Sequence, residues 1–370
     1  MCRSIGEEKM RKFGRLGVAL LVTAALTSAA GGADLKQIGS IKIPGEILAN
    51  FDISFVDQEA GRYYLADRSN KAIDIFDAQN DTYLGRAGAF IGTIMKNGKV
   101  NNDVSGPNGV VIVGKEIWGG DGDSTLKIID IGTQATTATI STGGTTRLDE
   151  MAYDAKDQVF IGVNNAEDPP FVTLISTQPD HKILGKITFA DATDGAEQPA
   201  YNPDDGLFYE SIPQLGKDPK HGGIAVIDPV AAKLIRIIPL ENCHPAGLAF
   251  GPSGNFVLGC DANGKDMPAA TTIMNAKSGA VVAVVAGIGG ADMADYNAKN
   301  HQYYTASRSN PGGPVLGVID ADKNTLVQTI PIAGGTPHSV ASSEASGHVF
   351  VPVGATAGGD GTIHVYAPVN

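Results

Sequence analysis

A short hydrophobic run that ends in a small or turn-forming residue recurs along the whole chain. The seven runs lie at residues 73–77, 126–130, 172–176, 224–228, 272–275, 316–320 and 363–367. Their last residues are separated by 53, 46, 52, 47, 45 and 47 positions. A period of about 40–50 residues that is built from short strands is typical of β-propeller blades.

Each copy of the repeat has the same internal order. In the fifth copy, a strand at 247–250 precedes a turn at 251–254, a second strand at 255–259, the recurring run and an outer strand at 280–286. This order predicts an all-β, seven-bladed β-propeller with four antiparallel strands per blade. The last copy ends before a fourth strand, so we expect residues 37–43 to supply it and close the ring. Two separate β-sandwiches are the alternative.

The first 33 residues have the pattern of a secretory signal peptide. A basic stretch at 10–15 precedes an apolar stretch at 16–26 and small residues that suit cleavage. An uncleaved anchor formed by this segment is the alternative. Outside it, no stretch of the sequence is long enough to span a membrane. We therefore predict a signal peptide at residues 1–33, a single propeller domain at residues 34–370, and a periplasmic or secreted location.

The charge balance limits the kinds of partner. The chain has 28 Lys and Arg against 40 Asp and Glu, which gives a net charge of −12. Five basic and two acidic residues fall in the first 33, so the remaining chain carries −15. An acidic body is a poor partner for nucleic-acid phosphates but attracts cations. We expect a monomer that binds a small molecule or a protein partner.

Two segments resemble the repeats of the YncE-like, YVTN-type β-propellers. They are residues 318–341, which contain Ile330-Pro331-Ile332-Ala333-Gly334-Gly335, and residues 245–254. The YVTN tetrapeptide itself is degenerate, as in Tyr64-Leu65-Ala66-Asp67. The resemblance covers nearly all of residues 34–370 and implies the fold more than the function. Lactonases and other metal-dependent hydrolases are more distant relatives by fold.

The innermost strands line the axial channel of a propeller, so their first residues converge at one end, the axial mouth. Alignment of the seven strands by the turns that follow them gives a mostly polar set at this position. The set is Asp52, Asn108, Asp149, Gln198, Ala246, Asp292 and His338, with Glu150, Glu197 and His244 adjacent in sequence. We predict that Asp52, Asn108, Asp149, Gln198, His244, Asp292 and His338 bind a ligand.

Oxygen-rich sets of this kind suit a divalent cation. Asp52, Asn108, Asp149, Asp292 and His338 are the candidate metal ligands, and Ca²⁺ is the ion expected first. A contribution from histidine also suits Zn²⁺ or Mn²⁺. The alternative is a solvated channel mouth in which water bridges the polar groups. Three arginines of the surrounding loops, Arg68, Arg147 and Arg308, are candidates for holding a carboxylate or phosphate in two hydrogen bonds.

Cys243 and Cys260 flank the hairpin centred near residues 252–253, so they nearly face each other. In an oxidising compartment we predict a disulfide between them. The alternatives are a metal site formed with His244 and a redox-active pair.

Two functions remain open from the sequence. The first is an exported propeller that binds a small ligand, an ion or a protein partner at the axial mouth. The second is a metal-dependent hydrolase or lyase of the lactonase kind, and a redox accessory role is a third, weaker possibility. The sequence has no Cys-x-x-Cys-His haem motif, no nucleotide-binding phosphate loop and no set of tryptophans typical of quinoproteins.

Overall fold

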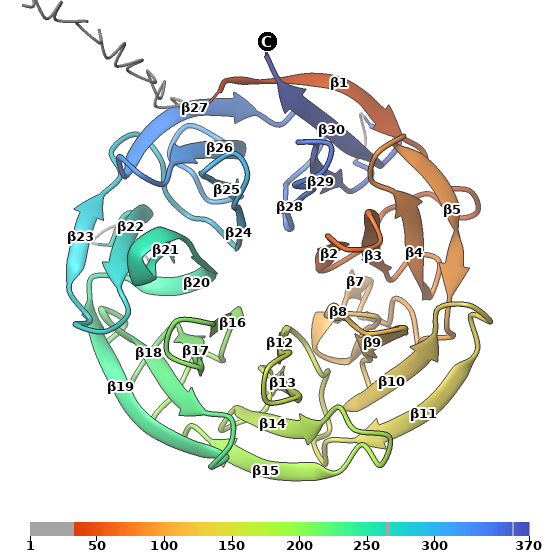
Figure 1. Cartoon of the computed structure of the whole chain (residues 1–370), viewed down its shortest axis with the longest axis horizontal. Coiled ribbons are helices and arrows are strands. Elements are labelled where there is room, and N and C mark those ends of the chain that lie inside the picture. The colour runs from red at the N-terminus through yellow and green to blue at the C-terminus, as the bar shows by residue number, and fades with distance from the viewer. Residues whose placement is uncertain (1–32, 264–266, 357–358, 370) are drawn as a thin grey trace, which may run out of the picture. The chain divides into compact units, whose positions relative to one another are not determined.

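The computed structural model of the chain describes residues 33–263, 267–356 and 359–369. Within these residues, seven four-stranded antiparallel sheets stand radially around a common axis (Figure 1). The described residues belong to one compact unit. The predicted all-β, seven-bladed propeller is confirmed. The predicted signal peptide lies outside the described residues apart from Ala33.

The strands of each blade follow one another from the axis outward. Blade 1 contains β2 (Ser54–Asp57), β3 (Arg62–Asp67), β4 (Ala72–Asp77) and β5 (Thr82–Ala87). Blade 2 contains β8 (Val110–Val113), β9 (Glu116–Gly120), β10 (Thr125–Asp130) and β11 (Thr136–Ser141). Blade 3 contains β12 (Met151–Asp154), β13 (Val159–Asn164), β14 (Phe171–Ser176) and β15 (Ile183–Thr188). Blade 4 contains β16 (Pro199–Asn202), β17 (Leu207–Ile212), β18 (His221–Asp228) and β19 (Lys233–Glu241).

The other blades have the same order. Blade 5 contains β20 (His244–Phe250), β21 (Asn255–Asp261), β22 (Ala270–Asn275) and β23 (Val281–Val284). Blade 6 contains β24 (Met293–Asn297), β25 (Gln302–Ser307), β26 (Val315–Asp320) and β27 (Thr325–Pro331). Blade 7 contains β28 (Ala341–Ser342), β29 (Val349–Val353), β30 (Thr362–Pro368) and, outermost, β1 (Leu35–Ile41).

The hydrophobic core lies between neighbouring blades. Second strands such as β13 are buried along their whole length, whereas the outer strand β15 alternates between exposed and half-buried residues. Between blades 2 and 3, the rings of Trp118 and Phe160 pack 5.1 Å apart in one cluster with Val111 and Met151. Each blade therefore needs both neighbours to bury its two faces, which explains why the repeats form a ring.

Aspartates at the ends of third strands fix the turns that follow. Asp77 Oδ1 accepts the backbone N–H groups of Gln79 and Asn80 at 2.8 and 2.9 Å. Asp228 Oδ1 accepts two backbone N–H groups in the same way. These local bonds give the recurring turn-forming residue of the sequence its physical role.

The amino-terminal strand closes the ring, as the sequence predicts. β1 pairs antiparallel with β30, from Leu35 opposite Pro368 to Ile41 opposite Ile363. Leu35 and Ile41 are buried in two different core clusters. The side chain of Gln328 also accepts the N–H group of Leu35 at 2.8 Å and donates to its carbonyl oxygen at 3.1 Å. β1 thus joins blade 7 to the outer strand of blade 6.

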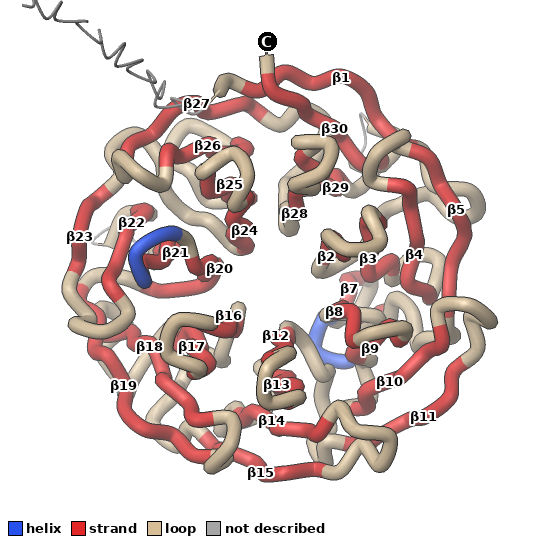
Figure 2. The backbone as a smooth tube through the Cα atoms, in the orientation of Figure 1, coloured by secondary structure: helices blue, strands red, loops and turns tan. Residues whose placement is uncertain are grey.

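An insertion that the repeat pattern does not predict precedes the inner strand of blade 2. A hairpin of β6 (Met95–Lys96) and β7 (Lys99–Val100) and a single 3₁₀ turn, η1 (Asn102–Val104), lie between β5 and β8. The turn is one of two short helical segments in the described residues (Figure 2); the other, η2, spans Pro252–Gly254. The insertion accounts for the longest repeat spacing and brings Asn102 to the axial mouth.

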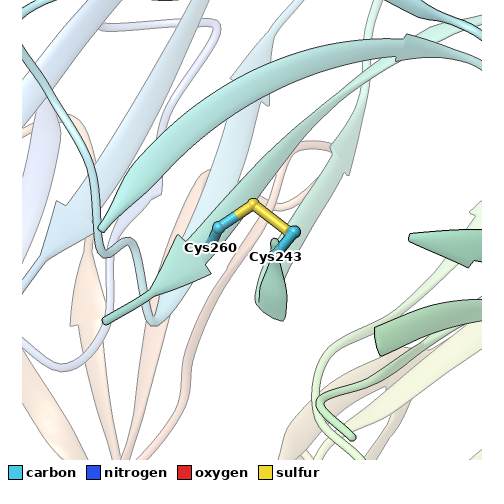
Figure 3. Close-up of a disulfide and its surroundings, with 2 residues drawn as sticks. All are labelled: Cys243 and Cys260. Atoms are coloured by element: carbon cyan, nitrogen blue, oxygen red, sulfur yellow. A yellow bond between two sulfur atoms is a disulfide. The ribbon is translucent and has the colours of Figure 1, made fainter. Parts of the chain in front are cut away.

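The predicted disulfide is confirmed. Cys243 precedes β20 and Cys260 lies on β21, and their sulfur atoms are bonded across 17 residues of chain (Figure 3). Because both sulfurs are in this bond, neither is a thiolate metal ligand in this state. A disulfide is compatible with an exported protein. Across the residues that the structure describes, no helix is long and apolar enough to cross a membrane.

Candidate functional site

The backbone brings the predicted polar residues to equivalent positions in different blades. The N–H groups of Asp52, Asn108, Asp149 and Asp292 each donate to a carbonyl oxygen of the second strand of their own blade, at 2.7–3.0 Å. The residue that makes this bond in blade 4 is Glu197, to Ser211 at 2.9 Å. The sequence alignment is therefore wrong by one residue in blade 4, where Glu197 takes the place given to Gln198.

The side chain of Gln198 bridges backbone groups of two other blades. Its Oε1 accepts the N–H groups of Leu248 at 2.8 Å and Ala294 at 3.1 Å, and its Nε2 donates to the carbonyl oxygen of Ala294 at 3.1 Å. Gln198 thus links blade 4 to blades 5 and 6 inside the channel.

Asp52 is the most heavily paired carboxylate of the axial mouth. It is buried, and its two oxygens contact Arg68 and His338, while Arg147 Nη1 lies 3.7 Å away. Burial alone would raise the pKa of Asp52, but Arg68 and His338 outweigh burial and hold this pKa well below its usual range. Asp52 is therefore ionised at neutral pH.

His338 connects two carboxylates from different blades. Its Nε2 contacts Asp52 and its Nδ1 contacts Asp292. Burial opposes the charged form, but Asp292 and Asp52 together raise the pKa of the imidazole to about 10. Both ring nitrogens then carry protons, as donation to two carboxylates requires. His338 is therefore a cation that holds blades 7, 1 and 6 together at the mouth.

The three arginines that the sequence assigned to ligand binding are engaged by side chains of the protein. Arg68 donates to Asn108 Oδ1 from Nε at 3.1 Å and to Asn102 Oδ1 from Nη1 at 3.1 Å, besides its pair with Asp52. Arg147 Nη2 lies 2.7 Å from Asp149 Oδ2. Arg308 Nη2 lies 2.7 Å from Asp292 Oδ1. Their role toward a ligand stays a prediction.

The carboxylates do not form a recognisable metal site. Across the described ranges, no group of three or more His, Cys, Asp or Glu side chains is arranged so that it could hold a metal ion. Asp52, Asp149 and Asp292 each face an arginine, and Asn108 Oδ1 accepts from Arg68. These four predicted ligands are therefore paired with arginines of the protein. The predicted cation stays a prediction.

A second group of mouth residues holds more carboxyl groups than cations. Glu150 is 5% exposed, and burial followed by the charges of Glu197 and Asp149 raises its pKa well above the usual range. Burial, Asp292 and Asp149 raise the pKa of Glu197 to about 8. Burial also raises the pKa of Asp149 to about 7, although Arg147 opposes the shift. The mouth thus has a charge-balanced part and an acidic part.

Two oxygen atoms of the acidic part have no hydrogen-bond partner. They are Asp149 Oδ1 and Glu150 Oε2, both buried and unpaired among the described residues. A buried acceptor without a donor costs about 1–3 kcal/mol. This cost is offset when a ligand or water supplies the missing donors.

His244 lies apart from this network. Its Nε2 is 2.8 Å from Asp194 Oδ2, an exposed carboxylate of the loop between β15 and β16. Asn102, in contrast, is a mouth residue that the sequence analysis did not identify. The unusually long first spacing is the trace of the inserted segment that carries it.

A cavity of about 560 Å³ follows the channel from the mouth. Its lining begins at Ile53, Gln198 and Met293 and continues along the inner strands to Gln58, Asp204 and Glu344. This volume falls within the roughly 300–1,000 Å³ of small-molecule sites. The lining includes Gln198, which follows Glu197 in the chain, and none of the mouth carboxylates.

Comparison with known proteins gives the fold and no closer relationship. The sequence matches no protein-family profile and no curated protein. Its structure is similar to that of hydrazine synthase from Kuenenia stuttgartiensis, with a TM-score of 0.66 and 12% identity over 88% of this chain and 99% of that one. The likeness is one of fold alone. The chain is also similar to one from the crystal structure of a mitotic checkpoint complex, with a TM-score of 0.65 and 11% identity over 98% of this chain and 99% of that one.

These identities are too low to transfer an activity, a ligand or a partner to the propeller. They confirm the seven-bladed architecture. The relationship to YncE-like propellers stays a prediction, since no family profile matches.

Replacing Glu197 by glutamine tests the protonation of the acidic part. Folded Glu197 keeps its proton up to about pH 8, whereas its unperturbed pKa is 4.5. Its contribution to stability is therefore full below pH 4.5 and is lost as the pH rises through 8. We expect Glu197→Gln to leave the free energy of unfolding unchanged at pH 4 and to raise it at pH 9 by about 1–3 kcal/mol.

Urea unfolding at both pH values measures this difference. Glu59→Gln, at an exposed turn position, is the control and should change stability little at either pH. Equal stability of wild type and Glu197→Gln at pH 9 would contradict the prediction.

Proposed function

We propose that the chain is an exported β-propeller that binds a small, positively charged ligand with several N–H donors, such as an organic amine, at its axial mouth. The observation that carries the proposal is the pair of buried, unpaired oxygens, Asp149 Oδ1 and Glu150 Oε2. Glu197 adds a third carboxyl group to the same part of the mouth. An ammonium group supplies both the charge and the donors that this part lacks.

The charge pattern favours a cationic ligand over an anionic one. Arg68, Arg147 and Arg308 are each paired with an aspartate, and Arg68 also donates to two asparagines. The unpaired buried atoms of the mouth are acceptors. The net charge of the whole chain, −12, also attracts cations to the protein.

Export is the second part of the proposal. It is supported by the signal-like pattern of residues 1–33 and by the disulfide. Fractionation of cells that express the whole chain, with the mass of the recovered protein, tests it. A product shortened by about 30 residues and found outside the cytoplasm is expected, and a full-length cytoplasmic product contradicts it.

Calorimetric titration of the purified protein with putrescine and ethanolamine tests the binding site. We expect binding that is tighter at pH 8.5 than at pH 6, because protonation of Glu197 removes a negative charge. The variant Glu150→Gln/Glu197→Gln should weaken binding at least tenfold. The control, Glu46→Gln/Glu59→Gln, changes two exposed glutamates and should bind as the wild type does.

Two other results distinguish the alternatives. Binding of Ca²⁺ in place of the amines would contradict the proposal and support the predicted metal site. Amine binding that is unchanged in Glu150→Gln/Glu197→Gln would place the ligand elsewhere and also contradict it. Hydrolysis of a lactone by the purified protein, with loss of this activity when a chelator is added, would support a metal-dependent lactonase.

A further inference from the structure

A set of aromatic side chains lies at one level of the axial cavity, beyond the acidic mouth. Four consecutive blades, 3 to 6, have an aromatic residue near the end of the inner strand. It is the second-to-last residue in β12, β16 and β24 and the last residue in β20. These residues are Tyr153, Tyr201, Phe250 and Tyr296, and all four line the cavity. Phe55 of blade 1 lines it as well. The aromatic residues of blades 3 to 6 therefore form an arc along the cavity lining.

The register of the sheets explains why the four rings share a level. Each lies opposite an aromatic residue on the second strand of its own blade. The pairs are Tyr153 with Phe160, Tyr201 with Phe208, Phe250 with Phe256 and Tyr296 with Tyr303. The ring centroids of Tyr201 and Phe208 are 5.4 Å apart and those of Tyr296 and Tyr303 are 5.2 Å apart. The second-strand rings are buried, so they hold the cavity-lining rings in place.

The lining of this cavity has acidic groups and no basic ones. Among the described residues that line it, Asp204, Asp295 and Glu344 are acidic, and none is Lys, Arg or His. Asp295 lies next to Tyr296, and its Oδ2 accepts a hydrogen bond from Ser342 Oγ at 2.6 Å. Burial raises the pKa of Asp295 to about 6, so the group is still ionised at pH 7.5. A negative charge thus lies beside the aromatic arc without a neighbouring cation in the lining.

From this arrangement we infer a second binding site, for an organic cation without N–H donors, such as a quaternary ammonium group. Aromatic rings attract such cations through their negative faces, and a carboxylate adds charge without requiring a hydrogen bond. The site differs in chemistry from the mouth, where unpaired oxygens require donors. It also differs in position, because Glu150 and Glu197 do not line the cavity.

Titration of the purified protein with choline tests the inference. The matched probe is 3,3-dimethylbutan-1-ol, which has the same shape without the charge. We expect choline to bind at least about threefold more tightly than the alcohol, since a cation–π contact contributes about 0.5–2 kcal/mol. Equal binding of the two probes, or no binding of choline, would overturn the inference.

Substitutions locate the site. Tyr296→Leu and Asp295→Asn should each weaken choline binding about 3- to 30-fold. Tyr83→Leu, on the outer strand β5 and outside the cavity, should leave it unchanged. Asp295→Asn keeps the shape of the side chain, so it remains informative if Tyr296→Leu does not fold. Unaltered choline binding in Asp295→Asn and Tyr296→Leu would refute this site.

The two proposed sites can fail separately. Glu150→Gln/Glu197→Gln should lose putrescine binding and retain choline binding. Loss of both ligands in that variant would show that choline occupies the mouth, and this would overturn the second site alone.

Discussion

We expect the double substitution Leu35→Ala/Ile41→Ala to lower the free energy of unfolding by about 4–8 kcal/mol. Both side chains are buried, at 3% and 7% exposure, in separate core clusters beneath the closing strand β1. Truncation of a buried Leu or Ile costs about 2–5 kcal/mol, and distant sites add. The loss approaches the whole stability of an ordinary domain.

Urea unfolding followed by circular dichroism measures the effect. Lys36→Ala/Ser40→Ala changes two exposed residues of the same strand and should cost less than about 1 kcal/mol. Similar losses in the two variants would show that β1 contributes little through its buried face. We also expect the first variant to aggregate, because release of β1 leaves β30 as an open sheet edge.

Replacement of Arg68 by alanine should lower the free energy of unfolding by about 3–5 kcal/mol. Arg68 is 3% exposed and is the cation in contact with Asp52, which is itself buried. Its removal leaves a buried carboxylate with His338 and a more distant Arg147, and it leaves Asn108 Oδ1 without its donor. The cost arises mainly from the partners that remain.

Thermal and urea unfolding check this prediction, with two comparisons. The exposed pair of Lys42 and Asp360 is the control, and Lys42→Ala should cost less than about 1 kcal/mol. The double variant Arg68→Ala/Asp52→Ala should lose less than the sum of the two single losses, since neither charge is then left alone. Additive losses would mean that the two side chains do not stabilise each other.

Much of the fold could be predicted because it depends on local patterns that recur. The spacing of the third strands gave the number of blades, and the early end of the last repeat required the strand at β1. The positions of Cys243 and Cys260 about one turn gave the disulfide. The hairpin of β6 and β7 could not be predicted in this way, because it occurs once and belongs to no repeat.

The site was harder to predict, because its chemistry depends on pairings between blades. Asp52 and His338 are 286 residues apart, and only the closed ring brings them together. Their neighbouring arginines were assigned to a ligand, whereas the structure pairs them with aspartates of the protein. The position of Glu197 was missed by one residue, because alignment by turns does not show which backbone N–H group bonds to the second strand. The backbone bond of Glu197 to Ser211 corrects this assignment.

Closure of the ring by β1 has a consequence for the order in which the protein folds. Leu35 finds its partner, Pro368, only after the whole domain has been synthesised. Contacts this far apart in sequence form late and slow folding, so the first strand waits unpaired while the blades assemble in turn. Until β1 pairs with β30, blade 7 has three strands and an open outer edge. An open edge of this kind can pair with the amino-terminal strand of a second copy.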